Sequence, residues 1–594
     1  MAGPGGVGSP ALGLDGLSVF FMLVVTIAAV PALLFARDAP RGTPHRRLLN
    51  GLTVAFVLAL LLVLAARDAV TFLAGWELMT LIPASAILVV RREAPVRRAV
   101  FVYLAITHLG GVGVWVALLV LANEWAIGGA APTGGVQALV AVAALIGFGT
   151  KAGLMPLHAW LPRAHPVAPA QLSALMSGVM VKVALYGLIR VLFWWDGPGP
   201  RWVGLVLLAL GLLSALGGIL YALVQRELKR LLAFSTIEHV GIVALALGAS
   251  LVLAAGDAGP RMWSALAFAA ALLHVAGHAV AKALLFLGAG AFARGTGGGL
   301  ELDRLGGLLA RMPWSGWAFL TGCAGIAGVA PFGVFVSEWL TLQALLHVAY
   351  EPVAGVALAG ALAVAGLAAT AALAVFCFVK VAGLVLLGTP RSDAATAAAE
   401  QPRATRAALA LLAGLVLAGG LAAGVLVPPF ARLAPGGGQA VSDGVGLALP
   451  STGGLPVLGI AVALVAITVV VRLAVRGPRA AERPAWACGQ RVGPALAWTS
   501  AGFAKPLRLM LETGFRPRRE VRTDIRHGVV QRVTHTAEVP HLFDAWLYAP
   551  VHRAALRGAT LARRLQSGSV RAYLGYLLGA LVLLLALART GWLG

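Results

Sequence analysis

The sequence has 594 residues, of which 60% are hydrophobic and only 12% are charged, and its mean hydropathy is +0.89. A soluble domain cannot bury that much apolar surface, so the composition excludes an ordinary globular protein and predicts an all-α, polytopic membrane protein. The formal net charge of +23 would suggest nucleic-acid binding in a soluble protein. Here the basic residues cluster in short loops and one long polar segment, as membrane insertion requires, which disfavours a nucleic-acid partner.

Long apolar runs predict about fourteen membrane-spanning helices. Loops rich in Arg and Lys alternate with loops that carry few positive charges, which predicts that both termini face outside and that the basic loops face the cytoplasm. The predicted spans are 16–36, 51–66, 69–90, 98–122, 136–157, 168–193, 202–224, 230–255, 262–292, 314–347 (interrupted at 328–333), 353–388, 406–427, 455–475 and 573–588.

The chain is expected to divide into six parts. They are an N-terminal segment with the first helix (1–50), two repeats (51–193 and 202–388), peripheral helices (406–475), a long polar segment (476–571) and a last span (572–594). The polar segment holds many arginines interleaved with Trp, Phe, Tyr and Leu. Its apolar content is too thin for a core of its own, so we expect a cytoplasmic amphipathic helix along the membrane or a neighbouring subunit rather than a folded domain.

Two stretches predict broken helices. In 145–190, two apolar runs carry Lys151 and Lys182 and are joined by a proline-rich break, at Pro156, Pro162, Pro166 and Pro169. An ammonium inside a spanning helix costs about 2.5–3.5 kcal/mol, so it is rare without a use. A broken helix leaves backbone groups that lipid cannot satisfy, so it should line a protein-walled or wet cavity.

The second break has a similar setting. The second to sixth helices end in the break with Lys151, and a helix with Lys182 follows; the seventh to eleventh end in a break with Glu338, and a helix with Lys380 follows. Paired broken segments in corresponding halves are typical of inverted repeats with an ion path near the middle of the membrane.

Glu77 and the two lysines are candidate pathway residues. Glu77 lies among apolar neighbours. It could be a carboxyl near a helix end that is protonated or snorkels to the interface. In a functional interpretation it carries a proton or keeps a buried lysine charged. Lys151 and Lys182 could each snorkel to an interface. In the functional interpretation, moving or protonating Glu77 makes Lys151 release its proton.

A row of titratable groups lies on one later helix. His274, His278 and Lys282 recur every four residues and therefore share a helical face. An i,i+4 histidine pair can bind metal, but no carboxylate or third ligand lies near in the sequence, so we expect no metal site. Hydrogen-bonded core histidines are the plainer alternative; a hydrated proton relay is the use we favour.

Glu338 follows the second break and is the expected terminal carboxylate of the path. Lys380 could support it or could snorkel to an interface. Glu238 and His239 lie within one turn of each other in an apolar run, where they either join the path or pair locally. Further polar groups could hold water along the route: Tyr103, Thr107, His108, Ser173, Ser177 and Thr236.

No motif for a bound cofactor is found. The three cysteines, Cys323, Cys377 and Cys488, are far apart and form no C-x-x-C pair, which argues against an iron–sulfur cluster, a zinc site or a disulfide framework. We therefore expect no redox or catalytic centre and no cofactor in this chain. Met1 to Asp15 lacks the basic region of a signal peptide, so the first spanning helix should direct insertion.

Several long motifs together resemble one family. FLAGWELM, GFGTKAGLMPLHAWLPRAHPVAPAQLSALMSGVMVK, RELKRLLAFSTIEHVGIV, HVAGHAVAKALLFLGAGA and GVAPFGVFVSEWL look like the antiporter-like proton-pumping subunits of respiratory complex I and the Mrp antiporters. HPVAPAQLSALMSGVMVK and LLAFSTIEHVGI are most similar to the large membrane subunit of formate-hydrogenlyase-type nickel–iron hydrogenases, the hydrogenase-4 component B type. The resemblance covers nearly the whole chain from Leu14.

The resemblance implies two inverted five-helix repeats, each with a discontinuous helix, and a polar axis across the membrane plane. By matching motif, Glu77 and Lys151 would be the family's carboxylate–lysine pair, and Lys182 the next lysine inward. A central relay would consist of His274, His278 and Lys282, and Glu338 would be the distal residue. Family members usually carry two further helices before the LDGLSVFF stretch, near which this sequence begins.

We therefore expect a proton-translocating subunit of a redox-driven complex in a bacterial inner membrane, an energy-converting hydrogenase or a complex I-like assembly. Its partners would be the other membrane subunits and the peripheral arm, whose redox step would push on Glu77 and Lys151. Two alternatives stay open: a subunit of a multisubunit Na⁺/H⁺ antiporter, and a membrane coupling subunit of an inorganic-carbon uptake complex. A purely structural anchor is disfavoured by the charges expected inside the membrane.

Overall fold

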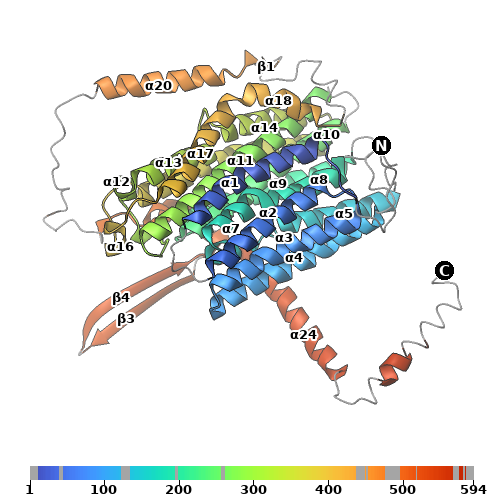
Figure 1. Ribbon diagram of the computed structural model, residues 1–594, viewed down its shortest axis with the longest axis horizontal. Coiled ribbons are helices and arrows are strands. Elements are labelled where there is room, and N and C mark those ends of the chain that lie inside the picture. Colours follow the sequence, from blue (N-terminus) through green and yellow to red (C-terminus); the bar gives the residue numbers. More distant parts are fainter. Residues whose placement is uncertain are drawn as a thin grey trace. The chain divides into compact units, whose positions relative to one another are not determined.

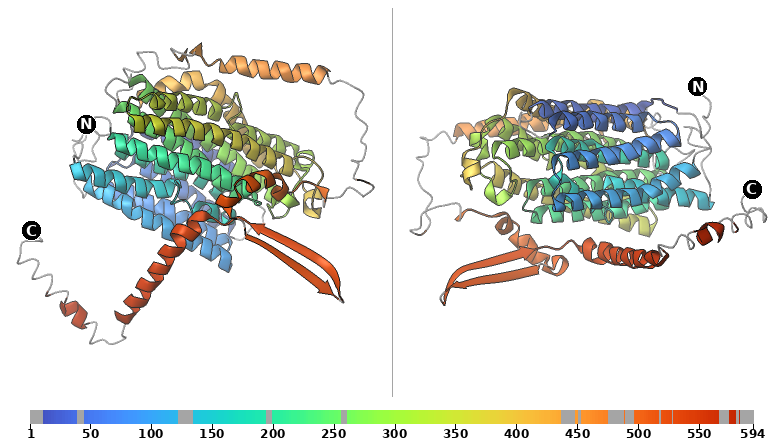
Figure 2. Two further views of the ribbon diagram at one scale, coloured as in Figure 1. Left: turned by 180° about the vertical axis from the view of Figure 1, so that it is seen from behind. Right: turned by 60° about the horizontal axis from the view of Figure 1, so that its bottom comes forward.

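The computed structural model describes residues 11–38, 45–121, 134–193, 199–255, 261–435, 448–449, 453–474, 488, 496–516, 518–526, 528–565, 574–579 and 582. The chain forms two units, Met1–Pro506 and Leu507–Gly594, and each is described by itself. In the first unit, helices far longer than they are wide lie side by side in a bundle (Figures 1 and 2).

The first unit is built mainly of helices. They are α1 (Gly16–Arg37), α2 (Arg46–Ala65), α3 (Ala69–Val90), α4 (Ala94–Val120), α5 (Gly134–Ala152), α6 (Leu161–Val167), α7 (Ala170–Leu175), the π-helix η1 (Met176–Met180), α8 (Val181–Phe193), α9 (Arg201–Val224), α10 (Leu228–Ala254), α11 (Arg261–Gly295), the 3₁₀ turn η2 (Leu302–Arg304), α12 (Leu308–Arg311), α13 (Pro313–Ile326), α14 (Gly333–Ala349), α15 (Ala354–Val385), α16 (Asp393–Thr396), α17 (Arg403–Leu421), α18 (Ala423–Arg432), α20 (Val457–Ala474) and α21 (Ser500–Phe503), with the two-residue strands β1 (Ala448–Leu449) and β2 (Gly453–Gly454).

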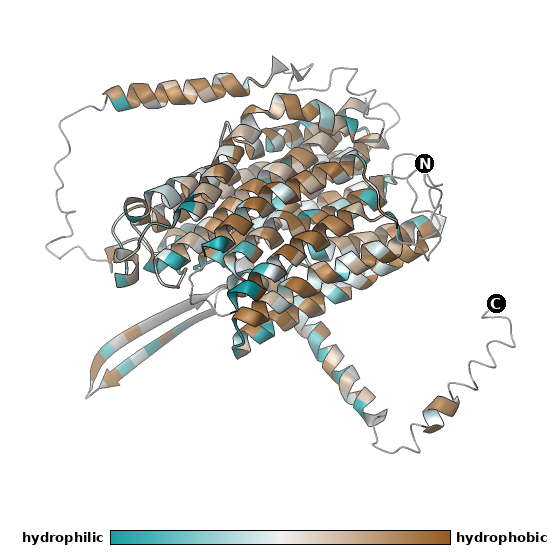
Figure 3. Ribbon diagram, viewed as in Figure 1, coloured by the Kyte–Doolittle hydropathy of each residue, from teal (hydrophilic) through white to brown (hydrophobic). Residues whose placement is uncertain are grey.

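The expected fold class is confirmed. Among the described residues, twelve helices are long and apolar enough to cross a membrane, counting α7, η1 and α8 as one helix, and α14 is a shorter apolar helix. Brown, apolar residues cover most of the length of these helices in Figure 3. The exact number of crossings stays a prediction, because the last expected span, 573–588, lies largely outside the described residues.

Two helices form the buried centre of this unit. Nearly every residue of α10 is buried, and the α7–η1–α8 helix is buried along its whole length. α10 packs against α9, α11 and α14, and α11 packs against α7, α13 and α17. Polar side chains on α8, α10 and α11 are therefore enclosed by other helices, which allows ionisable groups to lie at membrane depth away from lipid.

Both predicted breaks are confirmed. α5 ends at Ala152, earlier than the predicted 157, because Gly153 has a φ of +86° that a continuing helix cannot contain. α13 ends at Ile326 and α14 begins at Gly333, and Gly328 between them has a φ of +66°. A left-handed glycine lies just after the end of each helix, ahead of the prolines that the sequence analysis emphasised. The interpretation as inverted repeats stays a prediction.

Two other boundaries differ from expectation. The predicted helix 168–193 contains a π-helical turn, η1, between α7 and α8. The predicted helix 406–427 is α17 followed, after one residue, by α18, which contains Pro428 and Pro429.

The long polar segment is more varied than predicted. It contains α22 (Lys505–Met510), α23 (Glu512–Phe515), the antiparallel hairpin of β3 (Arg518–Arg526) and β4 (Val529–Glu538), the π turn η4 (Asp544–Tyr548) and α24 (Ala549–Leu565). Only α24 is the long helix that we expected. The hairpin forms where β-branched residues alternate with arginines, a period-2 pattern. Among the side chains described from residue 507 on, none is buried, in agreement with an apolar content too thin for a core.

Candidate functional site

The ionisable residues singled out in the sequence are almost all enclosed. Lys151 and Lys182 are 1% exposed, and Lys282, His274 and Lys380 are fully buried. Burying a charge is costly unless hydrogen bonds or opposite charges compensate for the lost water. The partners of each group therefore decide what it can do.

Lys182 is held by the π-helical turn. Its Nζ donates to the carbonyl of Ser177, 2.6 Å away, five residues earlier in the chain. The hydroxyl of Ser177 lies 2.7 Å from that of Thr236 on α10. A π turn widens the helix locally and is often found at functional sites. Here it brings a backbone carbonyl within reach of the buried ammonium.

The contacts continue from Thr236 to a second lysine. The Thr236 hydroxyl donates to the carbonyl of Leu232, 2.9 Å away, and Lys282 Nζ donates to the same carbonyl at 3.0 Å. Lys282 also makes a short hydrogen bond to the Ser235 hydroxyl. Lys182 and Lys282 are thus joined through the carbonyl and hydroxyl of Ser177, the hydroxyl of Thr236 and the carbonyl of Leu232. The sequence analysis named Ser177 and Thr236 but missed Ser235.

Three histidines follow from Lys282 toward α14. His239 Nδ1 and His274 Nε2 are 3.0 Å apart, and His274 Nδ1 lies 2.9 Å from the Ser337 hydroxyl. The ring of His278 lies 4.8 Å from that of His239, centroid to centroid. Of the two uses weighed for His239, joining the row is the one that the geometry supports. Ser337 was missed, because a serine beside Glu338 carries no signal of its own.

Glu338 ends this row. It is 8% exposed on α14, directly after Ser337. A Cβ added at Gly328 would lie 2.5 Å from Glu338 Oε2, so the left-handed glycine of the second break leaves the space that the carboxylate occupies. The break and the carboxylate are therefore parts of one local structure.

These groups also bear on the question of a metal. One ligand atom each from His239, His274 and Glu338 lies within 4.8 Å of the others, so the fold supplies the carboxylate that sequence spacing lacks. Nitrogens bound to one tetrahedral zinc would lie about 3.4 Å apart and could not share a proton. In this structure the two rings instead hydrogen-bond each other. The expectation that no metal binds here stays a prediction.

Glu238 lies beside the row but is not bonded to it. It is fully buried, its Oε2 is 4.0 Å from His239 Nε2, and among the described residues neither of its oxygens has a hydrogen-bond partner. A buried carboxylate without such partners is costly. Glu238 therefore suits a neutral, protonated carboxyl or a site for bound water.

Lys151 and Glu77 lie near each other but do not touch. Lys151 Nζ donates to the Thr80 hydroxyl at 2.5 Å and lies over the rings of Trp76 and Tyr103, 5.7 and 5.5 Å from their centroids. Thr80 is one turn from Glu77 on α3. Aromatic faces attract a cation, so this pocket stabilises the ammonium without a carboxylate contact.

Glu77 is paired with a histidine instead. Its Oε2 lies 3.1 Å from His108 Nε2, and its Oε1 accepts a hydrogen bond of 3.4 Å from the Trp115 indole. Within the described residues no ion pair of 4.0 Å or less joins Glu77 to Lys151. The expected direct pair is therefore absent from this arrangement, and His108, named only as a water-holding residue, takes the carboxylate.

Lys380 lies elsewhere. Its Nζ donates to the carbonyls of Leu223 and Gln225, 2.6 and 2.8 Å away, at the C-terminal end of α9. Among the described residues it makes no hydrogen bond or ion pair with Glu338, the support of which was one of the two uses considered for it. An ammonium satisfies the free carbonyls at a helix end and the negative end of its dipole, so this lysine is a C-terminal cap.

His165 is a further candidate that the sequence analysis did not name. It lies on α6, directly after the first break, is fully buried and stacks on Phe286 with ring centroids 4.9 Å apart. Neither ring nitrogen has a hydrogen-bond partner among the described residues. Its position in the quoted stretch AHPVAP, beside Pro166, was an available signal.

An ion pair anchors the far end of α8. Asp15 Oδ2 lies 2.5 Å from Arg190 Nη2 and 3.6 Å from Arg67 Nη2. Burial would raise the pKa of Asp15, but the backbone N–H of Ser18 and the Arg190 guanidinium outweigh it and hold the pKa below its usual value. The pair ties the start of α1 to the helix that carries Lys182.

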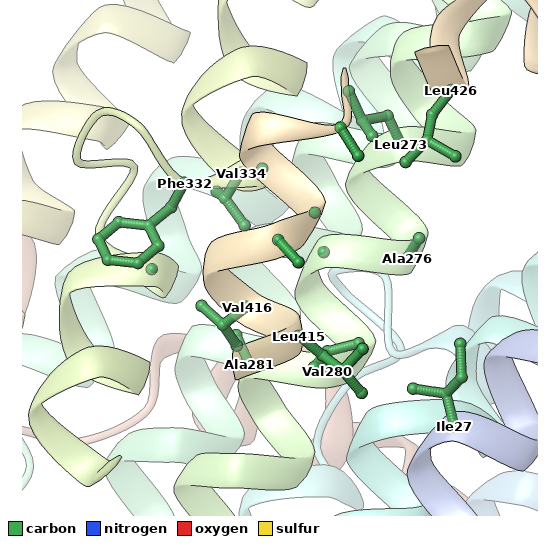
Figure 4. A pocket seen from close by; sticks show the side chains of 16 residues that line it. Ile27, Leu273, Ala276, Val280, Ala281, Phe332, Val334, Leu415, Val416 and Leu426 are labelled. Carbon is green, nitrogen blue, oxygen red and sulfur yellow. The ribbon is translucent and has the colours of Figure 1, made fainter. Parts of the chain in front are cut away.

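An apolar cavity of about 230 Å³ lies beside the second break. Figure 4 shows Phe332, Val334, Leu273, Val416 and other apolar side chains around it. None of its lining residues is ionisable. It offers no groups that could carry a proton, so the row through His274 and Ser337 stays the candidate route.

Comparisons with known proteins show the family and the fold. Residues 66–364 match the family described as NADH:quinone oxidoreductase/Mrp antiporter, transmembrane region. An uncharacterized protein of Mycobacterium tuberculosis is 41% identical over 97% of this chain and 92% of its own length. Hydrogenase-4 component B of Escherichia coli is 35% identical over 97% of this chain and 88% of its own. A subunit of an archaeal membrane-bound sulfane sulfur reductase has the same fold, with a TM-score of 0.72 at 21% identity over 98% of this chain and 92% of that one.

Proposed function

Since the chain belongs to the NADH:quinone oxidoreductase/Mrp antiporter family, we propose that it is the proton-translocating membrane subunit of a redox-driven complex. The observation that carries this proposal is the enclosed row of polar groups from Lys182 through Lys282 and the histidines to Glu338, parts of which are joined by hydrogen bonds. Helices with such groups in their interior mark proton relays in membrane proteins.

The first half of the row moves charge between two lysines. Ammonium groups at Lys182 and Lys282 repel each other in a medium of low dielectric constant, so a proton that reaches one favours release from the other. The hydroxyls of Ser177 and Thr236 lie between them and reorient easily. Backbone carbonyls hold the ammonium groups in place but cannot pass protons, so water must complete this part of the route.

The second half passes the proton to a carboxylate. Lys282 and His278 are one helical turn apart, and His239 and His274 share a hydrogen bond in which either ring can hold the proton. Ser337, the residue before Glu338, hydrogen-bonds to His274. Glu338 is then the last acceptor, and the adjacent break at 328–333 is the place for release.

Coupling to the redox step would take place at Glu77. When this carboxylate pairs with His108, as it does here, the ammonium of Lys151 keeps only its contacts with Thr80 and the two rings. A carboxylate that turned toward Lys151 would stabilise the ammonium, and one that turned back would favour proton release. A neighbouring subunit could drive this exchange, and the work against the membrane potential is about 2.3 kcal/mol per charge per 100 mV.

The test begins with the partners. The full chain is purified in mild detergent with everything that stays bound, the bound proteins are identified, and the assembly is reconstituted into liposomes. We expect redox proteins to copurify and acidification of the lumen when their electron donor and acceptor are supplied. A sodium gradient that drives proton flux without any redox partner would instead favour the Na⁺/H⁺ antiporter alternative.

The residue assignments need a separate readout. Lys282→Gln and Glu338→Gln should abolish proton movement while electron transfer by the complex persists or slows. Lys505→Gln is a matched control, because that lysine lies outside the bundle's spanning helices. Undiminished proton movement in both row variants would refute the proposed path, whatever the partners are.

A further inference from the structure

A second cavity lies at one end of the bundle, away from the row. It has a volume of about 670 Å³ and is lined by the ends of α1, α2, α3, α10 and α11 and by residues 166–171 between α6 and α7. All these helix ends adjoin the short basic loops that were predicted to face the cytoplasm. The cavity therefore lies at the level where lipid headgroups meet the protein.

The ionisable groups of this cavity are mainly cationic. Arg91, Lys229 and Arg294 line it, against one acid, Glu227. The Glu227 carboxylate accepts hydrogen bonds from the backbone N–H groups of Lys229 and Arg230, at 3.1 and 2.6 Å, so it is used as the N-terminal cap of α10. Arg91 pairs with Glu93 outside the lining, Nε to Oε2 at 3.5 Å, and the described lining residues still carry two more positive than negative charges.

Each cation is positioned but retains donors. Lys229 is 8% exposed, and its Nζ donates to the Ala168 carbonyl at 2.8 Å, which uses one of three N–H groups. The Arg294 guanidinium lies over the Phe35 ring, 3.7 Å from its centroid, and its Nη1 donates to the Phe35 carbonyl at 3.2 Å. Stacking and a single hydrogen bond fix the guanidinium plane and leave its other N–H groups available.

The other walls are apolar. Phe35, Leu49, Val90, Val167 and Leu300 line the same cavity, and Gln171 adds an amide. A free phosphate ion would use the cations only, whereas a phospholipid headgroup would also place its glycerol and first acyl carbons against these side chains. Basic pockets between spanning helices on the cytoplasmic side bind anionic lipid headgroups.

We propose that this cavity is a binding site for the phosphodiester headgroup of an anionic phospholipid, held by Arg294, Lys229 and Arg91. The site does not depend on the proposed function. Its floor is the segment that contains Ala168, directly before the helix that carries Lys182, so a bound headgroup would also fix the connection between the first break and α7.

The test measures lipid binding by the full chain. The protein is purified, stripped of lipid by detergent exchange, and its thermal unfolding is followed with added phosphatidylglycerol, phosphatidylcholine or inorganic phosphate; lipid retention is measured by native mass spectrometry. We expect phosphatidylglycerol to raise the melting temperature by several degrees and to remain bound. Phosphatidylcholine and phosphate should do neither.

Variants locate the site. Arg294→Gln and Arg91→Gln should each weaken phosphatidylglycerol binding at least tenfold, whereas Arg311→Gln, an exposed arginine of α12 outside the cavity, should not. Arg91→Gln removes an exposed side chain, so it keeps the test valid if Arg294→Gln fails to fold.

Three results would overturn the proposal. They are equal binding of the two lipids, wild-type binding by both variants, and stabilisation by inorganic phosphate equal to that by phosphatidylglycerol. A protein segment crosslinked from position 91 in native membranes, with no lipid retained, would assign the cavity to a partner subunit and would also overturn it.

Discussion

Replacing Gly328 by alanine tests whether the position of the Glu338 carboxylate matters for proton transfer. With a φ of +66°, alanine at this position carries the cost of the left-handed conformation, about 1–2 kcal/mol. The added Cβ would also lie 2.5 Å from Glu338 Oε2, whereas ordinary contacts begin at 3.4 Å, so the carboxylate must move by about 0.9 Å (3.4 minus 2.5). It is the flexible end of a side chain, so the carboxylate and not the backbone should yield.

We expect a modest loss of stability and a large loss of proton transfer. A displacement of about 1 Å at a reacting group can cost about 100-fold in rate. Proton uptake by the reconstituted complex should therefore fall between about tenfold and 100-fold, while thermal unfolding, followed by tryptophan fluorescence, should report only the backbone cost.

Gly297 provides the matched control. Its φ is +71°, and an added Cβ would meet nothing within 4 Å. Gly297→Ala should therefore destabilise the protein about as much as Gly328→Ala but leave proton uptake unchanged. If Gly328→Ala takes up protons at the wild-type rate and is as stable as Gly297→Ala, the position of the Glu338 carboxylate does not matter for proton transfer and the prediction is refuted.

Three further perturbations test other contacts. Thr236→Val removes the hydroxyl between the two lysines and should slow proton transfer about fivefold, since one hydrogen bond is worth about 1 kcal/mol. Thr370→Val, which removes a buried hydroxyl that donates to the Gly366 carbonyl within α15, should not slow it, and equal rates in the two variants would contradict the route. Lys380→Met leaves the carbonyls at the end of α9 unpaired, so it should lower the free energy of unfolding by about 1–3 kcal/mol but leave proton uptake unchanged. Abolished proton uptake at unchanged stability would instead mean that Lys380 is part of the proton pathway. The pKa of the Asp15 carboxyl is held below its usual 3.8, so the ion pair stabilises the fold above that pH and this stabilisation is lost as the pH falls through the lowered value. The melting temperatures of the wild type and Asp15→Asn should therefore differ at neutral pH and converge in acid. A difference in melting temperature that does not change with pH would contradict the pairing with Arg190.

The parts of the fold that depend on local chemistry could be predicted from the sequence. Apolar runs gave the spanning helices within a few residues, because length and hydropathy decide what crosses a bilayer. The first break was located correctly but attributed to prolines, whereas the left-handed Gly153 lies directly after α5. The second was placed at 328–333, and the left-handed Gly328 lies two residues after the end of α13. The hairpin of β3 and β4 was not predicted, because the low apolar content of that segment was considered and its alternation of β-branched and polar residues was not.

The candidate site could be predicted only as a set of residue types. Buried lysines and histidines stand out in an apolar run, and the structure brings Lys182, Lys282 and three histidines into one row. Which helix each one faces is a tertiary property. Lys380 is as conspicuous in the sequence as Lys282, yet it bonds to the end of α9, and serines such as Ser235 and Ser337 are too common to attract notice.

The separation between the Glu77–His108 pair and the row from Lys182 to Glu338 has an electrical consequence. Among the described residues, hydrogen bonds alone form no continuous path from Glu77 to Glu338, so protons cannot cross along this arrangement without water or a rearrangement. If protons follow the proposed axis, the missing connection prevents proton leak in this state, and a rearrangement near Lys151 is needed to complete the path. The residues around Lys151 would then control both proton leak and the coupling of proton transfer to the redox step.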